Sequence, residues 1–303
     1  MTFKSATSDA AAAILAEAEA WQGIMALDGD KTLDVYLDVK SPHAYLAVRP
    51  SLEVARDYRV KVNFLPYTLS YAALGVTTSV QSDMKRHPAT PASDRKARMY
   101  YAAARQYARL QKLPFRSPYR LLDSAAANKA FLFAKQQGLE VPFLMRVCVR
   151  GWGSGWRDYE VESLECLRGT LTETGARTDG FEAFMAPDGR GEVELAACMA
   201  KAEAAGCTGV PHYVLDDASS GWELGLFGRE HLALIRENFA PRDWPGGLMC
   251  APVSPMPGAA RPWIVEAAGE VRFADTEILA RNWSKNRSPL ARPRAARKAQ
   301  IEG

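Results

Sequence analysis

The sequence lacks a paired-cysteine motif. Its 303 residues include five cysteines, an odd number, and no two of them form Cys-x-x-Cys. This pattern argues against a disulfide framework, a zinc ribbon and a dithiol redox centre. Cys148 and Cys198 fall inside apolar helical patterns, so we expect them in the core. The cysteines stand at positions 148, 166, 198, 207 and 250.

Long hydrophobic runs are also missing. No apolar stretch approaches the ~18 residues of a membrane span. The Ala-rich region near the N-terminus is interrupted by Glu17 and Glu19, which is unlike a secretory signal. Hydrophobic residues make up 48% and charged residues 24% of the chain, which is typical of a soluble globular protein. We therefore expect a cytoplasmic protein with no membrane contact.

An excess of charge is confined to one end. The formal net charge of the chain is +3. Seven basic residues and one acidic residue lie from Arg281 onward, so this end carries +6 and the remaining residues carry a mildly acidic −3. Such a tail could touch nucleic acid. A solvated, disordered end is the favoured interpretation, and we expect no nucleic-acid partner.

Residues 33–50 combine a strand pattern with a helix start. Apolar and polar residues alternate up to Val39, and Ser41 and Pro42 then suit the N-cap and first position of a helix. A strand feeding a helix N-terminus gathers unpaired N–H groups and the positive end of the helix dipole, which stabilise an anion such as a thiolate. On this stretch alone, an ordinary helix cap is the favoured interpretation.

The alternation of patterns predicts an α/β fold. Strand patterns occur at residues 32–39, 60–67, 210–215 and 222–226. Helical patterns occur at residues 8–26, 42–58, 91–113, 124–137, 141–149, 160–168, 191–205 and 229–239. The first strand–helix–strand unit implies a parallel pair of strands. In helix 91–113 a broad apolar face is formed by Ala97, Tyr100, Tyr101, Ala104, Tyr107, Ala108 and the nearby Leu110.

We expect four parts in this chain. Residues 1–30 form an N-terminal helix, and residues 31–70 and 186–240 together form the sheet domain. Residues 71–185 form a helical insertion into that domain. Residues 241–303 form an irregular extension that ends in the basic tail; its prolines give no clear periodicity, although residues 263–267 are strand-like.

Two later stretches point to a binding site. Pro211, in Gly209-Val210-Pro211, stands at a strand start, where a cis bond would expose a backbone N–H and C=O to a ligand. An edge-strand proline is the alternative. Glu230 stands at the next helix N-terminus, where it could hold an ammonium group or simply favour the helix dipole.

Taken in their order along the chain, the Ser41–Pro42 stretch, the Val210–Pro211 stretch and the Glu230 stretch resemble those of a known family. That family contains the 2-hydroxychromene-2-carboxylate isomerases and the kappa-class glutathione transferases, which have a DsbA-like thioredoxin fold. The family's Ser-Pro-Tyr-x-Tyr-Leu is similar to residues 41–46, and its Gly-Val-Pro to residues 209–211. Its Leu-Phe-Gly, small polar, Asp, Arg run is similar to residues 226–231. The resemblance covers residues 32–240 and implies a thioredoxin-like sheet domain with an all-helical insertion.

The resemblance also implies glutathione as the cofactor. Ser41 would donate a hydrogen bond to its thiolate, and Val210, before a cis Pro211, would pair with its backbone. Arg229 and Glu230 complete the expected cofactor contacts, with Glu230 near the γ-glutamyl amine. The implied activity is isomerisation of a small conjugated aromatic acid by reversible thiolate addition, or a related transferase reaction. A homodimer is also implied.

Three of the four histidines, His43, His212 and His231, fall in these stretches. Chance placement in a polar cleft is the favoured interpretation. The sharper hypothesis is a pair of histidines near Ser41 that supplies an acid/base, with Ser41 and His43 as catalytic residues; a metal site is a third hypothesis. At the level of the whole protein, the rival to an enzyme is a non-catalytic thioredoxin-fold protein that keeps the cleft but has lost glutathione binding.

Overall fold

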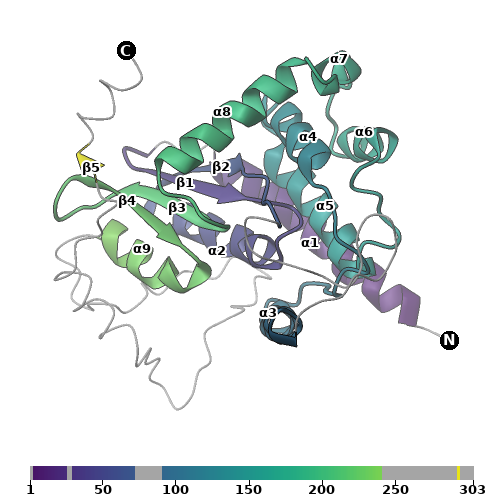
Figure 1. The fold of residues 1–303 in the computed structure, drawn as a ribbon, viewed down its shortest axis with the longest axis horizontal. Coiled ribbons are helices and arrows are strands. Elements are labelled where there is room, and N and C mark those ends of the chain that lie inside the picture. Colours follow the sequence, from purple (N-terminus) through teal and green to yellow (C-terminus); the bar gives the residue numbers. More distant parts are fainter. Residues whose placement is uncertain (1–2, 26–28, 72–90, 241–291, 294–303) are drawn as a thin grey trace.

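The computed structural model of the protein describes residues 3–25, 29–71, 91–240 and 292–293 (Figure 1). Most of the expected loop at 68–91 lies outside these residues. The strand-like residues 263–267, Cys250 and nearly all of the basic tail also lie outside them.

A mixed β-sheet forms the centre of the fold. β1 runs parallel to β2, and the remaining neighbours are antiparallel, in the order β2-β1-β3-β4-β5. The predicted parallel β1–α2–β2 unit and the later hairpin are both confirmed. The strands are β1 (Thr32–Leu37), β2 (Lys61–Pro66), β3 (His212–Asp216), β4 (Trp222–Phe227) and the two-residue β5 (Arg292–Pro293).

Helices cover both faces of this sheet (Figure 1). α2 and α9 contact each other on one side, and α4 and α8 pack against β2. The helices are α1 (Phe3–Met25), α2 (Pro42–Tyr58), α3 (Pro91–Leu110), α4 (Ala125–Lys135), α5 (Glu140–Ser154), α6 (Leu164–Glu173), α7 (Phe181–Met185), α8 (Arg190–Ala204), the 3₁₀ turn η1 (Arg229–His231) and α9 (Leu232–Phe239). Described residues between β2 and β3 contain no strand.

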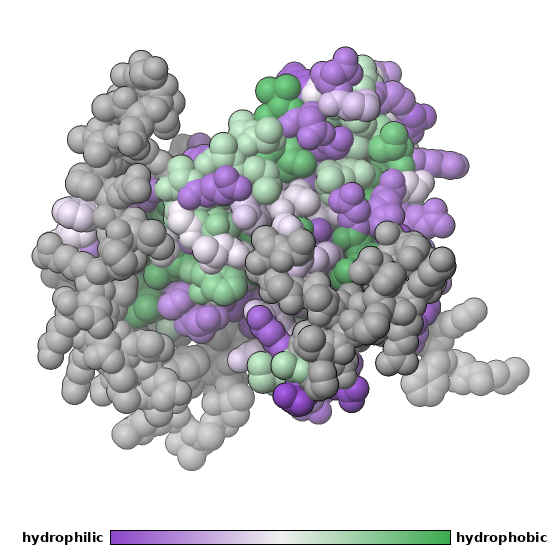
Figure 2. Space-filling view, in the orientation of Figure 1, coloured by the Kyte–Doolittle hydropathy of each residue, from purple (hydrophilic) through white to green (hydrophobic). Residues whose placement is uncertain are grey.

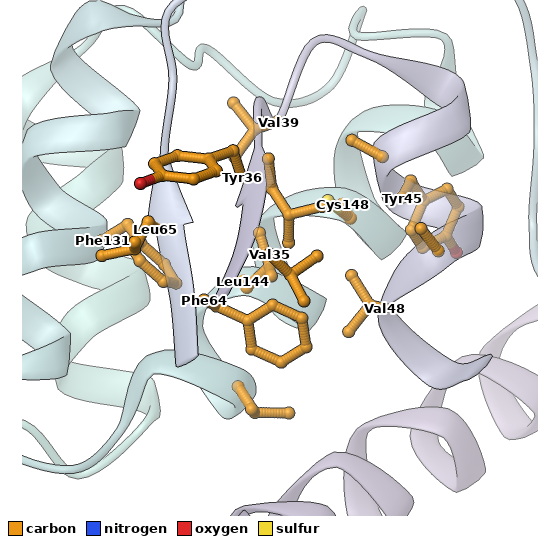
Figure 3. Packing of buried hydrophobic residues seen from close by; sticks show 14 of the residues in the cluster. Val35, Tyr36, Val39, Tyr45, Val48, Phe64, Leu65, Phe131, Leu144 and Cys148 are labelled. Carbon is orange, nitrogen blue, oxygen red and sulfur yellow. The ribbon is translucent and has the colours of Figure 1, made fainter. Parts of the chain in front are cut away.

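Alternation along β1 and β2 sends side chains into two apolar layers. Val35 stands in register with Phe64, and Tyr36 stands in register with Leu65. Figure 3 shows Val35 and Phe64 on the side of α2, whereas Tyr36 and Leu65 lie on the side of Phe131 from α4. All five side chains are buried. The sheet therefore has a packed core on each face, as expected of a thioredoxin-like sheet with helices on both sides.

The outer surface of the α7–α8 layer is mixed in character. Figure 2 shows hydrophilic residues gathered over α7 and a mixture of hydrophilic and hydrophobic residues along α8. Among the helices that the structure describes, none combines the length and apolar character required to cross a bilayer.

Several element boundaries differ from the prediction. α6 begins at Leu164 rather than 160, because Ser163 is its N-cap and accepts a hydrogen bond from the Cys166 N–H at 3.3 Å. The predicted helix 229–239 is divided into η1 and α9. By contrast, α2 spans residues 42–58 as predicted, because Ser41 and Pro42 define its start.

Helix α3 buries only part of its broad apolar face. Ala104 and Ala108 are buried and Tyr101 packs against the core, whereas Tyr100 and Tyr107 are 42% and 44% exposed. α3 contacts α2 through its small residues. The two tyrosines, one heptad apart, are therefore left on an accessible ridge.

Candidate functional site

Ser41 lies at the junction between β1 and α2. Its backbone is extended, with φ −90° and ψ 119°, and its Oγ accepts a hydrogen bond from the Ala44 N–H at 3.3 Å. The predicted N-cap is confirmed. The same hydroxyl donates to the carbonyl oxygen of Val210 at 3.4 Å, across 169 residues of sequence. Ser41 is only 6% exposed.

The segment before β3 lies directly against this junction. The Val210–Pro211 peptide bond is cis, as the family resemblance implied, and Pro211 is therefore not simply an edge-strand proline. β3 then pairs with β1, with His212 opposite Tyr36. The backbone approach of this segment is close, because a Cβ at Gly209 would lie 2.8 Å from the Phe227 ring. Ser41, Val210 and Pro211 are therefore brought together as expected.

His43 is half-buried in the first turn of α2. Its ring meets the Tyr100 ring edge-on, with centroids 4.7 Å apart and an interplanar angle of 85°. Burial lowers the pKa of His43 to about 4; the positive charge of Arg229 lowers it further, and the negative charge of Glu230 opposes both. The imidazole is therefore neutral at neutral pH.

Arg229 and Glu230 occupy η1, beside the end of β4. The Arg229 guanidinium lies over the Tyr107 ring, 4.2 Å from its centroid. Glu230 is exposed, and its carboxylate folds back over Gly228. Gly228 has φ +105°, and a Cβ there would stand 2.3 Å from a Glu230 oxygen, so only glycine suits this position.

The other two histidines have different surroundings from His43. The His212 side chain is buried, with Nε2 3.3 Å from the Ala205 carbonyl oxygen. His231 is near enough to lower the pKa of His212 electrostatically, although burial is the larger cause of that shift. No described contact joins His43 to another histidine. Within the described ranges, no group of three or more His, Cys, Asp or Glu residues could hold a metal ion.

A buried charge network beneath Ser41 escaped the sequence analysis. Asp38 is 1% exposed; its carboxylate accepts hydrogen bonds from the Leu69 N–H at 2.7 Å and the Lys40 N–H at 3.2 Å. Its carbonyl accepts from the Ser41 N–H at 2.9 Å. Burial raises the pKa of Asp38, against the attraction of the Lys40 ammonium 3.9 Å away. The network ties the Ser41 loop to the segment after β2.

No disulfide joins the four cysteines that the structure describes. Cys148 and Cys207 are buried, and Cys166 and Cys198 are half-buried; all four are free thiols. Burial raises the pKa of each of these thiols. The expected core position holds for Cys148, whereas Cys198 lies at the edge of the core.

The chain matches known proteins in fold. The family model of the DSBA-like thioredoxin domain matches residues 32–240. No curated protein matches the chain. Several solved structures are similar to it, including the following three. A 2-hydroxychromene-2-carboxylate isomerase (HCCA isomerase) has a TM-score of 0.50 and 20% identity, with 67% of this chain and 92% of that chain covered.

The second structure is a putative protein disulfide isomerase from Nitrosomonas europaea, with a TM-score of 0.50, 12% identity, and coverage of 68% of this chain and 96% of that chain. The third is the cytosolic disulfide reductase DsbM from Pseudomonas aeruginosa with GSH. Its TM-score is 0.46 and its identity 20%, with 66% of this chain and 92% of that chain covered. The family match spans most of the chain, and the chain therefore belongs to the DsbA-like thioredoxin domain family.

Proposed function

We propose that the protein is a glutathione-dependent isomerase of a small conjugated aromatic acid, or a closely related glutathione transferase. The observation that carries this proposal is the position of the Ser41 hydroxyl. It lies at the N-terminus of α2 and within 3.4 Å of the Val210 carbonyl that precedes cis Pro211. A hydroxyl donor and a helix N-terminus both favour a bound thiolate.

The backbone of Val210 fits a peptide such as glutathione. Its N–H donates no hydrogen bond among the described residues, and its C=O accepts only the long bond from Ser41. An extended peptide can form backbone hydrogen bonds with such a free N–H and weakly bonded C=O, as a strand added to a sheet edge does. The cysteinyl backbone of glutathione would make those two bonds, next to Ser41.

The Ser41 hydroxyl can turn its hydrogen from the Val210 carbonyl towards a bound thiolate. At 3.4 Å its bond to Val210 is near the limit of hydrogen-bond geometry and therefore weak. The Ala44 N–H still donates to the Ser41 oxygen, which polarises the hydroxyl and strengthens it as a donor. Rotation of the O–H bond alone would redirect the hydrogen, without loss of the helix cap.

The charged residues of η1 supply the remaining contacts. Glu230 is exposed beside the site and would accept a hydrogen bond from the γ-glutamyl ammonium. Arg229 would bind a carboxylate. His43, neutral at neutral pH, would act as a general base or hydrogen-bond acceptor toward the substrate. Its ring is held at its edge contact with Tyr100.

Glutathione, when bound, would supply the thiolate for reversible addition to a conjugated double bond, and an isomerase would not consume it. Ser41 and the α2 N-terminus would stabilise that anion before and after the reaction. A transferase would use the same residues but release a conjugate.

A second candidate function is non-catalytic. The Ser41 hydroxyl already has a donor in Ala44 and an acceptor in Val210, as an ordinary helix cap with one tertiary bond would. A thioredoxin-fold protein that no longer binds glutathione would keep both bonds.

Calorimetric titration with millimolar glutathione separates the two candidates. The wild type should bind, and Ser41→Ala should bind more weakly. Ser163→Ala is a matched control, because Ser163 caps α6 with the same 3.3 Å bond and similar backbone angles but lies in another element. Absence of binding to the wild type would refute the enzyme proposal. An equal loss in both variants would assign the effect to helix capping.

A further inference from the structure

Arg229 is a half-buried cation without an anionic partner among the described residues. Its Nε is buried and has no hydrogen-bond acceptor, and no Asp or Glu oxygen of the described chain lies within 4.0 Å of its guanidinium. Burial is the main cause that lowers the pKa of Arg229. A desolvated charge is costly unless an opposite charge or a hydrogen bond compensates it.

Glu230 is the nearest candidate for that compensation, but its geometry does not provide it. Its charge acts on Arg229 only weakly, after the influence of Tyr213 and Tyr107. Its carboxylate is folded back over the backbone of Gly228. Arg229 is instead supported through its flat face, which lies 4.2 Å from the centroid of Tyr107. The edge of the guanidinium carries the N–H groups, and none of them donates a hydrogen bond to a described residue.

The same place is lined by aromatic rings. Tyr107 and Tyr100 are seven residues apart on α3, so they lie on one face of that helix. Tyr107 meets Arg229 of η1, and Tyr100 meets His43 of α2. Both tyrosines remain more than two-fifths exposed. Two rings, a neutral imidazole and a guanidinium without an anionic partner among the described residues therefore come together where α3, α2 and η1 meet.

We propose that Arg229 anchors a carboxylate-binding site between η1 and α3, with Tyr107 and Tyr100 as the walls for a flat conjugated group attached to that carboxylate. A planar guanidinium binds a carboxylate with two parallel hydrogen bonds, and its face can stack on an aromatic ring at the same time.

The proposal rests on the proposed function for the identity of its ligand. Two carboxylates could reach Arg229: that of the conjugated aromatic acid and that of glutathione itself. The chemistry recognised is the same, and the experiment below distinguishes the sources.

The test measures binding of trans-cinnamate, its neutral amide and glutathione, each titrated separately by calorimetry. The proteins are the wild type, Arg229→Gln, Arg229→Lys and Arg105→Gln. Arg105 is a control because it lies on α3, exposed, with its guanidinium bonded to Ser117. Loss of a charge-assisted pair should weaken carboxylate binding by roughly tenfold to a hundredfold in Arg229→Gln, partly restored in Arg229→Lys. The amide should bind the wild type weakly and equally in all variants.

Each outcome bears on the site. Weaker cinnamate binding in Arg229→Gln with unchanged glutathione binding assigns the site to the aromatic acid, and the reverse assigns it to glutathione. Unchanged binding of both ligands in Arg229→Gln, or binding of neither ligand to the wild type, overturns the proposal.

Two outcomes separate this site from the proposed function. If glutathione binds and Arg229→Gln alters neither titration, the carboxylate site fails while the proposed function stands. If cinnamate alone binds and depends on Arg229, the site stands and the proposed function fails. Thermal unfolding of each variant confirms that it is folded.

Discussion

Ser41 combines a structural and a chemical property in one hydroxyl. The sequence predicted its capping role from Ser-Pro before an apolar helix, and the 3.3 Å bond from the Ala44 N–H confirms it. The contact with Val210 could not follow from local pattern, because the two residues are 169 positions apart. Their juxtaposition was expected only through the resemblance to a known family.

Asp38 shows what residue-level prediction left out. In the sequence it is one of the polar residues that alternate with apolar residues up to Val39. In the structure β1 ends at Leu37, and the chain turns so that Asp38 enters the core among backbone N–H groups. Alternation holds only while the strand lasts, so a polar residue just past its end can face either way.

His43 should titrate far below an ordinary histidine. Its pKa is lowered from 6.5 to about 4, so the folded protein binds this proton less tightly than the unfolded chain does. Stability from this group is therefore complete above pH 6.5 and is lost as the pH falls from 6.5 towards 4. NMR titration of the imidazole should give a midpoint near 4, and Arg229→Gln should move it upward.

A midpoint near 6.5 in the wild type would contradict this assignment. The pH–rate profile of His43→Tyr distinguishes the hypotheses for this residue. An unchanged profile supports chance placement, and loss of an ionisation supports the acid/base role.

At the scale of elements, α2 contains a proline in its interior that another element compensates. Pro50 has no N–H, so it cannot donate to the Leu46 carbonyl one turn earlier. The Gln111 side chain donates to that carbonyl instead, at 3.0 Å, from just beyond α3. Arg49 in turn donates to the Gln111 carbonyl at 2.8 Å. The end of α3 is thus tied to the helix that carries Ser41.

Gln111→Met should lower the free energy of unfolding by about 1–3 kcal/mol, because it leaves the Leu46 carbonyl buried without a donor. In a Pro50→Ala background, an amide N–H at position 50 can serve that carbonyl, so the same substitution should cost less. Urea unfolding of the four proteins in this double-mutant cycle measures the difference. Equal costs in both backgrounds would show that Gln111 does not replace the missing helix bond.

Helix α3 also shows what periodicity leaves undetermined. The pattern correctly placed Tyr100, Ala104, Tyr107 and Ala108 in one amphipathic helix. It could not decide which of two adjacent apolar strips meets the core. The small residues allow close approach to α2, so the alanines are buried and the tyrosines remain partly in solvent beside His43 and Arg229.

At the scale of the whole molecule, α1 lies outside the family match yet packs on its body. It contacts α5 and α2, with Trp21 only 3% exposed. Glu17 pairs with Arg49 at 2.6 Å, and the Gln22 side chain accepts from the Val141 N–H at 3.0 Å. These contacts indicate that α1 unfolds together with the thioredoxin-like domain.

Trp21→Ala should therefore lower the free energy of unfolding by about 3–5 kcal/mol, as expected for a buried tryptophan. Trp222→Ala is the control, because Trp222 is 36% exposed and its loss should cost about 0.5 kcal/mol or less. Urea unfolding monitored by circular dichroism measures both. A Trp21→Ala protein with unchanged global stability would mean that α1 is a separate, weakly attached element.

The division into a sheet domain, a helical insertion and an extension remains a prediction, since the described contacts do not test how these parts fold independently. The order of the first four strands and of most helices was predictable because each carries its own periodicity and turn residues. The short helix α7 and the two-residue strand β5 were not predicted. The relation of α1 to the core was not, because an amphipathic helix alone does not reveal the surface that it covers.

The central claim is that Ser41 stabilises a bound thiolate, and its most direct test is the pKa of the glutathione thiol in the complex. Ultraviolet titration of thiolate absorbance, with the protein in excess, measures that pKa in the wild type, Ser41→Ala and Ser163→Ala. The thiol pKa should lie below its value in free glutathione in the wild type and in Ser163→Ala. It should rise by about one to two units in Ser41→Ala, the worth of one charge-assisted hydrogen bond. Glutathione that binds the wild type and Ser41→Ala with the same thiol pKa would contradict the role of Ser41.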